Sequence, residues 1–172
     1  FPSITYRHAS ATKGARFSAS YPMNVLRIGM GLYGYDASFA ANNLKPVLSM
    51  RSFITSLREI PQGDSVGYNA SYTAEYPSRI ATVPAGYYEG IDRALSNVGS
   101  LQVNGVPAPI AGRVSMNMVS LDVTDVEAAR GDVVTLISRN PEDPNSVRSM
   151  ALVAGSTPYV LLAHIPTHLS RV

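Results

Sequence analysis

The sequence contains no cysteine and no tryptophan, and only 15% of its 172 residues are charged. Without cysteine the chain can form neither a disulfide framework nor a thiolate zinc site, which suits a reducing compartment and favours a cytoplasmic location. No apolar run approaches the roughly 20 residues that a membrane helix needs, and no basic and apolar leader is recognisable. We therefore expect no membrane partner.

Clustered positive charge is also lacking. The formal net charge is +2 although the sequence pI is about 9.0, and the arginines are scattered singly. A nucleic-acid partner is therefore not expected. The three histidines, His8, His164 and His168, lack the spacing and companions of metal ligands, so no metal site is predicted. What is abundant is apolar sequence, 45% of the residues, which predicts a folded core.

The chain begins at Phe1 rather than methionine, which suggests a processed product or an excised piece of something longer. Residues 1–43 differ in pattern from the rest. They predict a short helix around residues 9–17, a strand and loop within residues 25–36, and a polar break at residues 37–43. We interpret residues 1–43 as one unit and residues 44–172 as another.

From Leu44 onward the pattern is mostly that of short strands separated by turns. Asn104-Gly105 between two apolar runs is the preferred pair for a type I′ hairpin, because both central residues need positive φ. Ser146 and Thr157-Pro158 predict the starts of two helices. Many short strands with helices only near the end predict a mainly β fold, an antiparallel Greek-key-like barrel, with a short α/β remnant at the N-terminus.

Several stretches follow one another in a recognisable order. They are "RIGMGLYG" (27–34), "LKPVLSMRSFI" (44–54), "GDSVGYNASYTA" (63–74), "PAGYYEGIDRALSN" (84–97), "APIAGRVSMNMVSLDVTD" (108–125) and "AGSTPYVLLAHI" (154–165). Together they resemble the C-terminal part of alanine racemase, a pyridoxal phosphate enzyme. The resemblance implies a C-terminal β domain, a mostly missing (β/α)-barrel domain, and a homodimer whose active sites are shared between subunits.

The resemblance implies a reaction that interconverts L- and D-alanine, the D form being used in peptidoglycan synthesis. Racemisation removes a proton from one face of the α-carbon and returns one to the other, so two acid/base groups must flank it. Tyr68 aligns with the tyrosine that does this for the L-enantiomer, in the partner subunit's site. Ionising an ordinary phenol at pH 7 costs about 4 kcal/mol, so a neighbouring cation must help.

The resemblance also assigns a cradle for pyridoxal 5′-phosphate. Arg27 aligns with the arginine that faces the pyridine nitrogen, where a guanidinium keeps that nitrogen unprotonated. The other matches concern the phosphate: the backbone of Gly29 and Met30, and the hydroxyls of Tyr159 and Ser10.

The Schiff-base lysine of the family has no counterpart here. The only lysines are Lys13 and Lys45, and neither lies in a motif that matches the cofactor lysine. The segment alone is therefore expected to lack the covalent anchor and to be inactive.

Tyr87 and Met116 align with residues at the substrate entrance. Nearby, the sequence departs from the family: Asn117 replaces an aspartate, and Tyr88-Glu89 replaces Ala-Asp. These departures leave a related serine racemase open as an alternative. A second alternative, of another class, is a stand-alone β-barrel binding module for anionic ligands or nucleic acid, suggested by the pI and the aromatic residues.

Overall fold

The computed structural model describes residues 3–36 and 44–172. The chain divides into two compact units, Phe1–Leu48 and Ser49–Val172. The predicted division after residue 43, and the origin of the first part in another domain, stay predictions. The predicted polar break at residues 37–43 lies outside the described residues.

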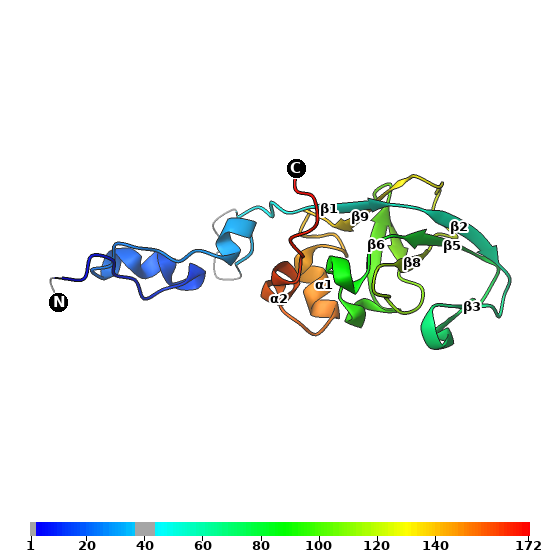
Figure 1. Ribbon diagram of the computed structural model, residues 1–172, viewed down its shortest axis with the longest axis horizontal. Helices are drawn as coiled ribbons and strands as arrows, with labels where there is room; N and C mark the ends of the chain where they lie inside the picture. Colours follow the sequence, from blue (N-terminus) through cyan, green and yellow to red (C-terminus); the bar gives the residue numbers. More distant parts are fainter. Residues whose placement is uncertain (1–2, 37–43) are drawn as a thin grey trace. The chain divides into compact units, whose positions relative to one another are not determined.

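Within residues 3–36 the first unit has two 3₁₀ helices, η1 (Thr12–Ser20) and η2 (Met30–Tyr33), drawn in blue in Figure 1. The helix expected around residues 9–17 therefore begins and ends later than predicted. The strand expected within residues 25–36 was wrong, because residues 3–36 and 44–48 contain no strand. The segment has no ladder partner there: the N–H groups of Asn24 and Val25 both donate to one carbonyl, that of Arg7.

The second unit is mainly β. Its strands are β1 (Met50–Phe53), β2 (Ser56–Ile60), β3 (Ser65–Val66), β4 (Tyr72–Thr73), β5 (Ser78–Val83), β6 (Ser100–Val103), β7 (Val106–Pro109), β8 (Val119–Asp122) and β9 (Val133–Ile137). Its helices are η4 (Tyr68–Ala70), η5 (Tyr87–Glu89), η6 (Arg93–Leu95), α1 (Val147–Val153) and α2 (Pro158–Ala163).

The strands form a barrel whose two main sheets close on each other (Figure 1). One sheet has the order β1-β9-β6-β7 and the other β2-β5-β8, all antiparallel. The chain passes from β1 into β2 through Ile54 and Thr55, whose N–H groups donate to Asp132 and Thr82 of the two different sheets. On the other side a bridge between Ile110 and Leu121 joins β7 to β8. Closure removes free strand edges, and the predicted fold class is confirmed.

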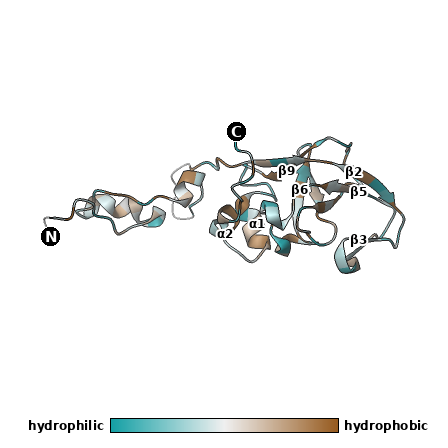
Figure 2. Ribbon diagram, viewed as in Figure 1, coloured by the Kyte–Doolittle hydropathy of each residue, from teal (hydrophilic) through white to brown (hydrophobic). Residues whose placement is uncertain are grey.

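The core lies inside this barrel. Ile54, Ile80, Leu101 and Leu121 are fully buried, and each apolar side chain of this size contributes about 1.5–3 kcal/mol when it leaves water. In β8 the burial alternates along the strand. Figure 2 shows hydrophobic and hydrophilic residues in the same strands, as expected when one face is covered and the other meets water.

The predicted turn and helix starts are confirmed. Asn104 and Gly105 connect β6 to β7 with φ of 50° and 83°, the positive values that this hairpin requires. Ser146 caps α1, its hydroxyl accepting the N–H of Ser149 at 3.2 Å. Pro158 occupies the first turn of α2, where its missing N–H leaves no bond unmade.

The small hairpin of β3 and β4 is attached to the barrel through Tyr72. Its hydroxyl donates to a carboxylate oxygen of Asp122 at 2.8 Å. Burial, together with this carboxylate, raises the pKa of Tyr72 to about 12. Burial alone would raise the pKa of Asp122, but hydrogen bonds from Thr124 and Tyr72 outweigh it and lower that pKa. The pair therefore favours a neutral phenol beside an ionised carboxylate.

Replacing Tyr72 by Phe should lower the free energy of unfolding by about 1 kcal/mol near neutral pH, because a hydrogen bond to a charged acceptor is lost. The native state holds the phenolic proton more tightly than the unfolded chain, whose pKa is near 10.0. The stabilisation from this hydrogen bond is complete below the unfolded-state pKa of 10.0 and is lost as the pH rises towards the folded-state pKa of about 12. Denaturant unfolding of both proteins at neutral and alkaline pH should show the difference shrinking. A difference that stays constant would contradict the assignment.

Candidate functional site

Tyr68 lies at the tip of the β3–β4 hairpin, as the first residue of η4. It is 67% exposed, so its phenol is not enclosed in its own barrel. The tip is conformationally demanding: Gly67, Asn69 and Ala70 all have positive φ, at 78°, 62° and 48°. A left-handed residue other than glycine costs about 1–2 kcal/mol, so the tip must be held by its surroundings.

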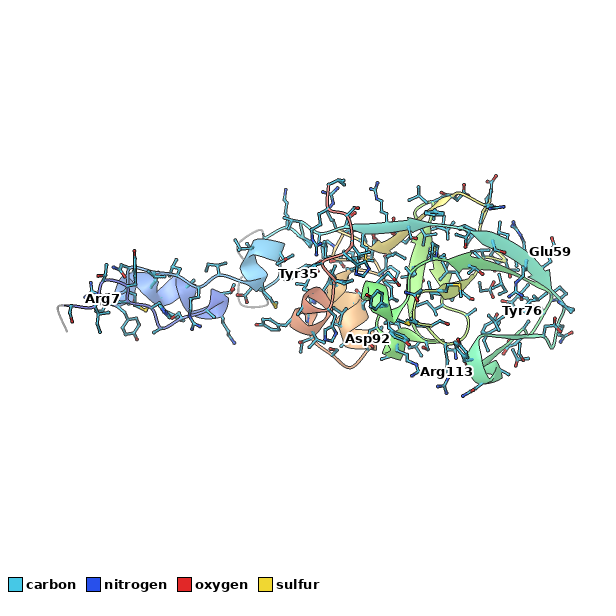
Figure 3. The ribbon with its side chains drawn as sticks, in the orientation of Figure 1. Arg7, Tyr35, Glu59, Tyr76, Asp92 and Arg113 are labelled. Atoms are coloured by element: carbon cyan, nitrogen blue, oxygen red, sulfur yellow. The ribbon has the colours of Figure 1, made fainter. Side chains whose placement is uncertain are left out.

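The first support of the tip is a close approach of two main-chain segments. A Cβ added to Gly112, whose φ is 87°, would lie 2.7 Å from the carbonyl oxygen of Val66. A Cβ added to Gly67 would lie 3.1 Å from the backbone nitrogen of Arg113. Arg113 is labelled in Figure 3 beside the β3 hairpin. Glycine at both places lets the backbone before Tyr68 rest directly on residues 112–113.

The second support is a pair of polar residues after η6. The amide oxygen of Asn97 accepts the N–H of Gly112 at 2.6 Å, and its amide nitrogen donates to the carbonyl of Ser71 at 2.9 Å. The hydroxyl of Ser96 accepts the N–H of Val114 at 3.0 Å. Sequence reasoning missed both residues. Their only signal was a Ser-Asn pair in a loop, which is typical of any turn.

The same segment of the chain also meets the predicted entrance residues. The N–H of Tyr87 donates to the carbonyl of Ser115 at 3.0 Å, and the N–H of Tyr88 to that of Met116 at 2.9 Å. A Cβ on Gly86 would lie 2.2 Å from the Ser115 oxygen, so only glycine permits this contact. The structure thus brings Tyr87 and Met116 together, about half exposed, and connects them to the Tyr68 hairpin through residues 112–116.

Glu89 and Asn117, two of the departures noted in the sequence, are partners. One carboxylate oxygen of Glu89 accepts the N–H of Gly86 at 2.8 Å, and the other accepts the amide of Asn117 at 2.9 Å. An ionised aspartate at position 117 would have no hydrogen to donate and would face a like charge. The two departures therefore act as one unit that holds the turn carrying Tyr87.

A hollow of about 620 Å³ lies beside this turn. Tyr87, Asp92 and Arg93 line it from one side and Leu161 and His164 from the side of α2. Asp92 is labelled in Figure 3. The lining of the hollow includes the carboxylate of Asp92, the guanidinium of Arg93 and the ring of Tyr87. Such a mixture of charged and aromatic groups suits a small polar molecule.

Tyr159 is the second residue of α2 and is 63% exposed. Its backbone belongs to the first turn of the helix, where the chain is fixed by Pro158. The phenol is therefore free to meet a group supplied from outside this unit. Its predicted role at a phosphate stays a prediction.

The remaining predicted cofactor residues belong to the first unit. Arg27 and Gly29 are exposed, and a Cβ on Gly29 would meet no atom within 4 Å, so a bulky anion can approach this backbone. The N–H of Gly29 donates to the hydroxyl of Thr12 at 3.1 Å, which sequence reasoning missed. This N–H is therefore already paired within the first unit, and the predicted role of the Gly29 and Met30 backbone at a phosphate stays a prediction. A covalent anchor does not fit, because neither lysine of the chain matches the cofactor lysine.

Residues 3–36 and 44–172 contain no group of three or more His, Asp or Glu side chains that could hold a metal ion. They also contain no helix with the length and hydrophobicity needed to cross a membrane.

Comparison with known proteins identifies related chains. A family model described as "Alanine racemase, C-terminal domain" matches residues 47–172. The alanine racemase of Leptospira interrogans is 33% identical over 96% of this chain and 46% of its own length. That of Sorangium cellulosum is 44% identical over 76% of this chain and 35% of its own. The chain thus spans about half the length, or less, of the curated relatives that it matches.

Solved structures agree with this likeness. Biosynthetic alanine racemase from Pseudomonas aeruginosa superimposes with a TM-score of 0.77 at 39% identity, covering 87% of this chain and 42% of that one. Alanine racemase from Bartonella henselae, with covalently bound pyridoxal phosphate, superimposes with a TM-score of 0.84 at 30% identity, covering 95% of this chain and 45% of that one.

Replacing Gly112 by Ala tests the close approach beneath Tyr68. Gly131→Ala is the matched control, because Gly131 has a similar φ of 95° but no atom within 4 Å of an added Cβ. The control should cost about 1–2 kcal/mol of unfolding free energy from backbone strain alone. Gly112→Ala should cost about 1–3 kcal/mol more, because the methyl group collides with the carbonyl of Val66. Denaturant unfolding followed by circular dichroism measures both. Equal losses would show that the contact is looser than described.

Proposed function

The chain belongs to the alanine racemase family, and we propose that it forms the C-terminal part of a pyridoxal-phosphate-dependent enzyme that interconverts L- and D-alanine. The observation that carries the proposal beyond family membership is the exposed phenol of Tyr68 on a braced hairpin tip. A side chain held outward in this way suits a reaction in a neighbouring subunit. The product D-alanine would serve peptidoglycan synthesis.

In the proposed mechanism Tyr68 moves one proton. Its hydroxyl reaches the L-face of the substrate α-carbon in the partner subunit's site, takes the proton as phenolate, and returns it in the reverse direction. A phenolate at pH 7 costs about 4 kcal/mol without help. A neighbouring cation must therefore stabilise it. The second acid/base group, on the opposite face, is also supplied by the rest of the enzyme.

Pyridoxal phosphate, when bound, supplies the electron sink that makes the α-proton removable. Arg27 would face its ring nitrogen, and because a guanidinium neither accepts nor readily releases a proton, it would keep that nitrogen unprotonated. The main chain at Gly29 and Met30 and the hydroxyls of Ser10 and Tyr159 would hold the phosphate. The open space beside Gly29 would admit a phosphate, and the N–H of Gly29 would have to exchange the Thr12 hydroxyl for it.

Tyr87 and Met116 would form the substrate entrance. The hydrogen bonds between their two segments support that role, and Tyr87 also lines the adjoining hollow. A related racemase for serine is the second candidate. The pairing of Glu89 with Asn117 supports this second candidate, because it changes the polar groups of the turn at the proposed entrance.

Tyr68→Phe, made in the complete protein, tests the proton-transfer role. The substitution keeps the ring and removes the only titratable atom, so racemisation of L-alanine should slow by about 10²–10⁴-fold. Polarimetry or a coupled assay of D-alanine measures the rate. Tyr76→Phe is the control, because Tyr76 is also a half-exposed tyrosine, in the turn before β5, and has no proposed role. Normal racemisation by Tyr68→Phe would refute the assignment.

The isolated 172-residue chain should not bind the cofactor covalently at a single site, since it has only Lys13 and Lys45. We expect no defined Schiff-base absorption when pyridoxal phosphate is added, and no specifically labelled lysine by mass spectrometry after borohydride reduction. The complete protein, treated in parallel, should show both. Stoichiometric labelling of either lysine in the isolated chain would contradict this prediction.

A further inference from the structure

The hairpin tip that carries Tyr68 has few bonds of its own. β3 and β4 are paired at only two positions, Ser65 with Thr73 and Val66 with Tyr72. Beyond them the chain passes through consecutive left-handed residues, including Ala70 at φ of 48°. Two further backbone hydrogen bonds join Gly63 and Asp64 to Ala74 at the base of the hairpin. These bonds lie away from the tip and do not fix it, because a short hairpin alone is marginally stable in water. Contacts from other elements must fix where the phenol lies.

Asn97 provides such a contact from the turn between η6 and β6. Its amide oxygen receives the N–H of Gly112 and its amide nitrogen reaches the carbonyl of Ser71, at 2.6 and 2.9 Å. The partners lie 15 and 26 residues away in the sequence. Ser71 is the residue that leaves the tip, and Gly112 is the residue against which the tip rests. One side chain therefore fastens the far end of the tip to its support.

The residue type matches this task in two ways. Asn97 has φ of 61°, a left-handed conformation that asparagine adopts more readily than most other residues. Its amide also supplies an acceptor and a donor at once. Glycine would satisfy the backbone but make neither bond. Aspartate would keep the acceptor for Gly112 but lose the donor for Ser71.

We propose that Asn97 is a positioning residue for Tyr68, and that its two hydrogen bonds set the distance between the phenol and the α-proton that it moves. This inference rests on the proposed function. Proton transfer needs the acid/base group within hydrogen-bond reach of its target, and a displacement of about 1 Å can slow a reaction by about 100-fold. Asn97 acts through the backbone at Ser71 and does not itself touch the substrate.

The experiment compares Asn97→Gly and Asn97→Asp in the complete protein with Asn104→Gly. Asn104 is a matched control, because it too has positive φ, 50°, and its amide also donates a hydrogen bond, to Asp132 at 2.8 Å in the β6–β7 hairpin. We expect kcat for L-alanine to fall about 10–100-fold in Asn97→Gly, with KM little changed. The kcat of Asn97→Asp should fall less, and the kcat of Asn104→Gly should equal that of the unsubstituted protein.

A kinetic isotope effect separates positioning from general damage. With α-deuterated L-alanine the effect should increase in Asn97→Gly, because transfer to a misplaced Tyr68 becomes more rate-limiting. With α-deuterated D-alanine it should decrease, because the other acid/base group removes that deuterium, and the slower return of a proton by Tyr68 makes this removal less rate-limiting. Backbone hydrogen exchange at residues 71–73 should also quicken in Asn97→Gly and not in Asn104→Gly.

The outcomes separate this inference from the proposed function. Normal racemisation by Tyr68→Phe would overturn the proposed function itself. Loss of activity in Tyr68→Phe, with normal rates and isotope effects in both Asn97 variants, would overturn only the role of Asn97. Equal changes with both deuterated substrates, or equal losses in Asn104→Gly, would also overturn it, since they indicate a structural defect. Asn97→Asp keeps the test valid if Asn97→Gly folds poorly.

Discussion

The contact between the backbone at Gly67 and the backbone at Gly112 is the constraint on which the candidate site depends. A Cβ at Gly112 would collide with the carbonyl of Val66, and one at Gly67 would be tight against the nitrogen of Arg113. Because the two main chains touch, residues 112–116 can serve the Tyr68 hairpin on one side and the Tyr87 turn on the other. A single stretch of chain thus sets the positions of both, and neither could move without disturbing the other.

Closure of the barrel makes this contact possible. Between β1 and β2 the chain crosses from one sheet to the other at Ile54 and Thr55, and the bridge from Ile110 to Leu121 completes the ring. Residues 111–118 then leave the ring at a fixed point, directly after that bridge. The loop is irregular, yet its ends are held by a closed core. Loops supported in this way are where proteins commonly place binding and catalytic residues.

Most of the barrel could be predicted from the sequence, and much of the site's support could not. Short strands separated by turns, and the Asn104-Gly105 hairpin among them, are local signals, and the structure confirms them. The strand expected within residues 25–36 was wrong, because an apolar run with three glycines has no strand beside it among the described residues. Asn97 was missed for a related reason: its partners lie far away in the sequence, and nothing local reveals them.

In the turn that carries Tyr87, the two departures from the family, Asn117 and Glu89, are hydrogen-bonded to each other. Taken singly, Asn117 and Glu89 each weaken the likeness to the family. In the structure the amide of one donates to the carboxylate of the other, whose second oxygen holds the N–H of Gly86. An amide facing a carboxylate makes a charge-assisted bond, whereas two carboxylates there would repel each other. The pairing therefore preserves the turn that presents Tyr87 while altering its polar groups.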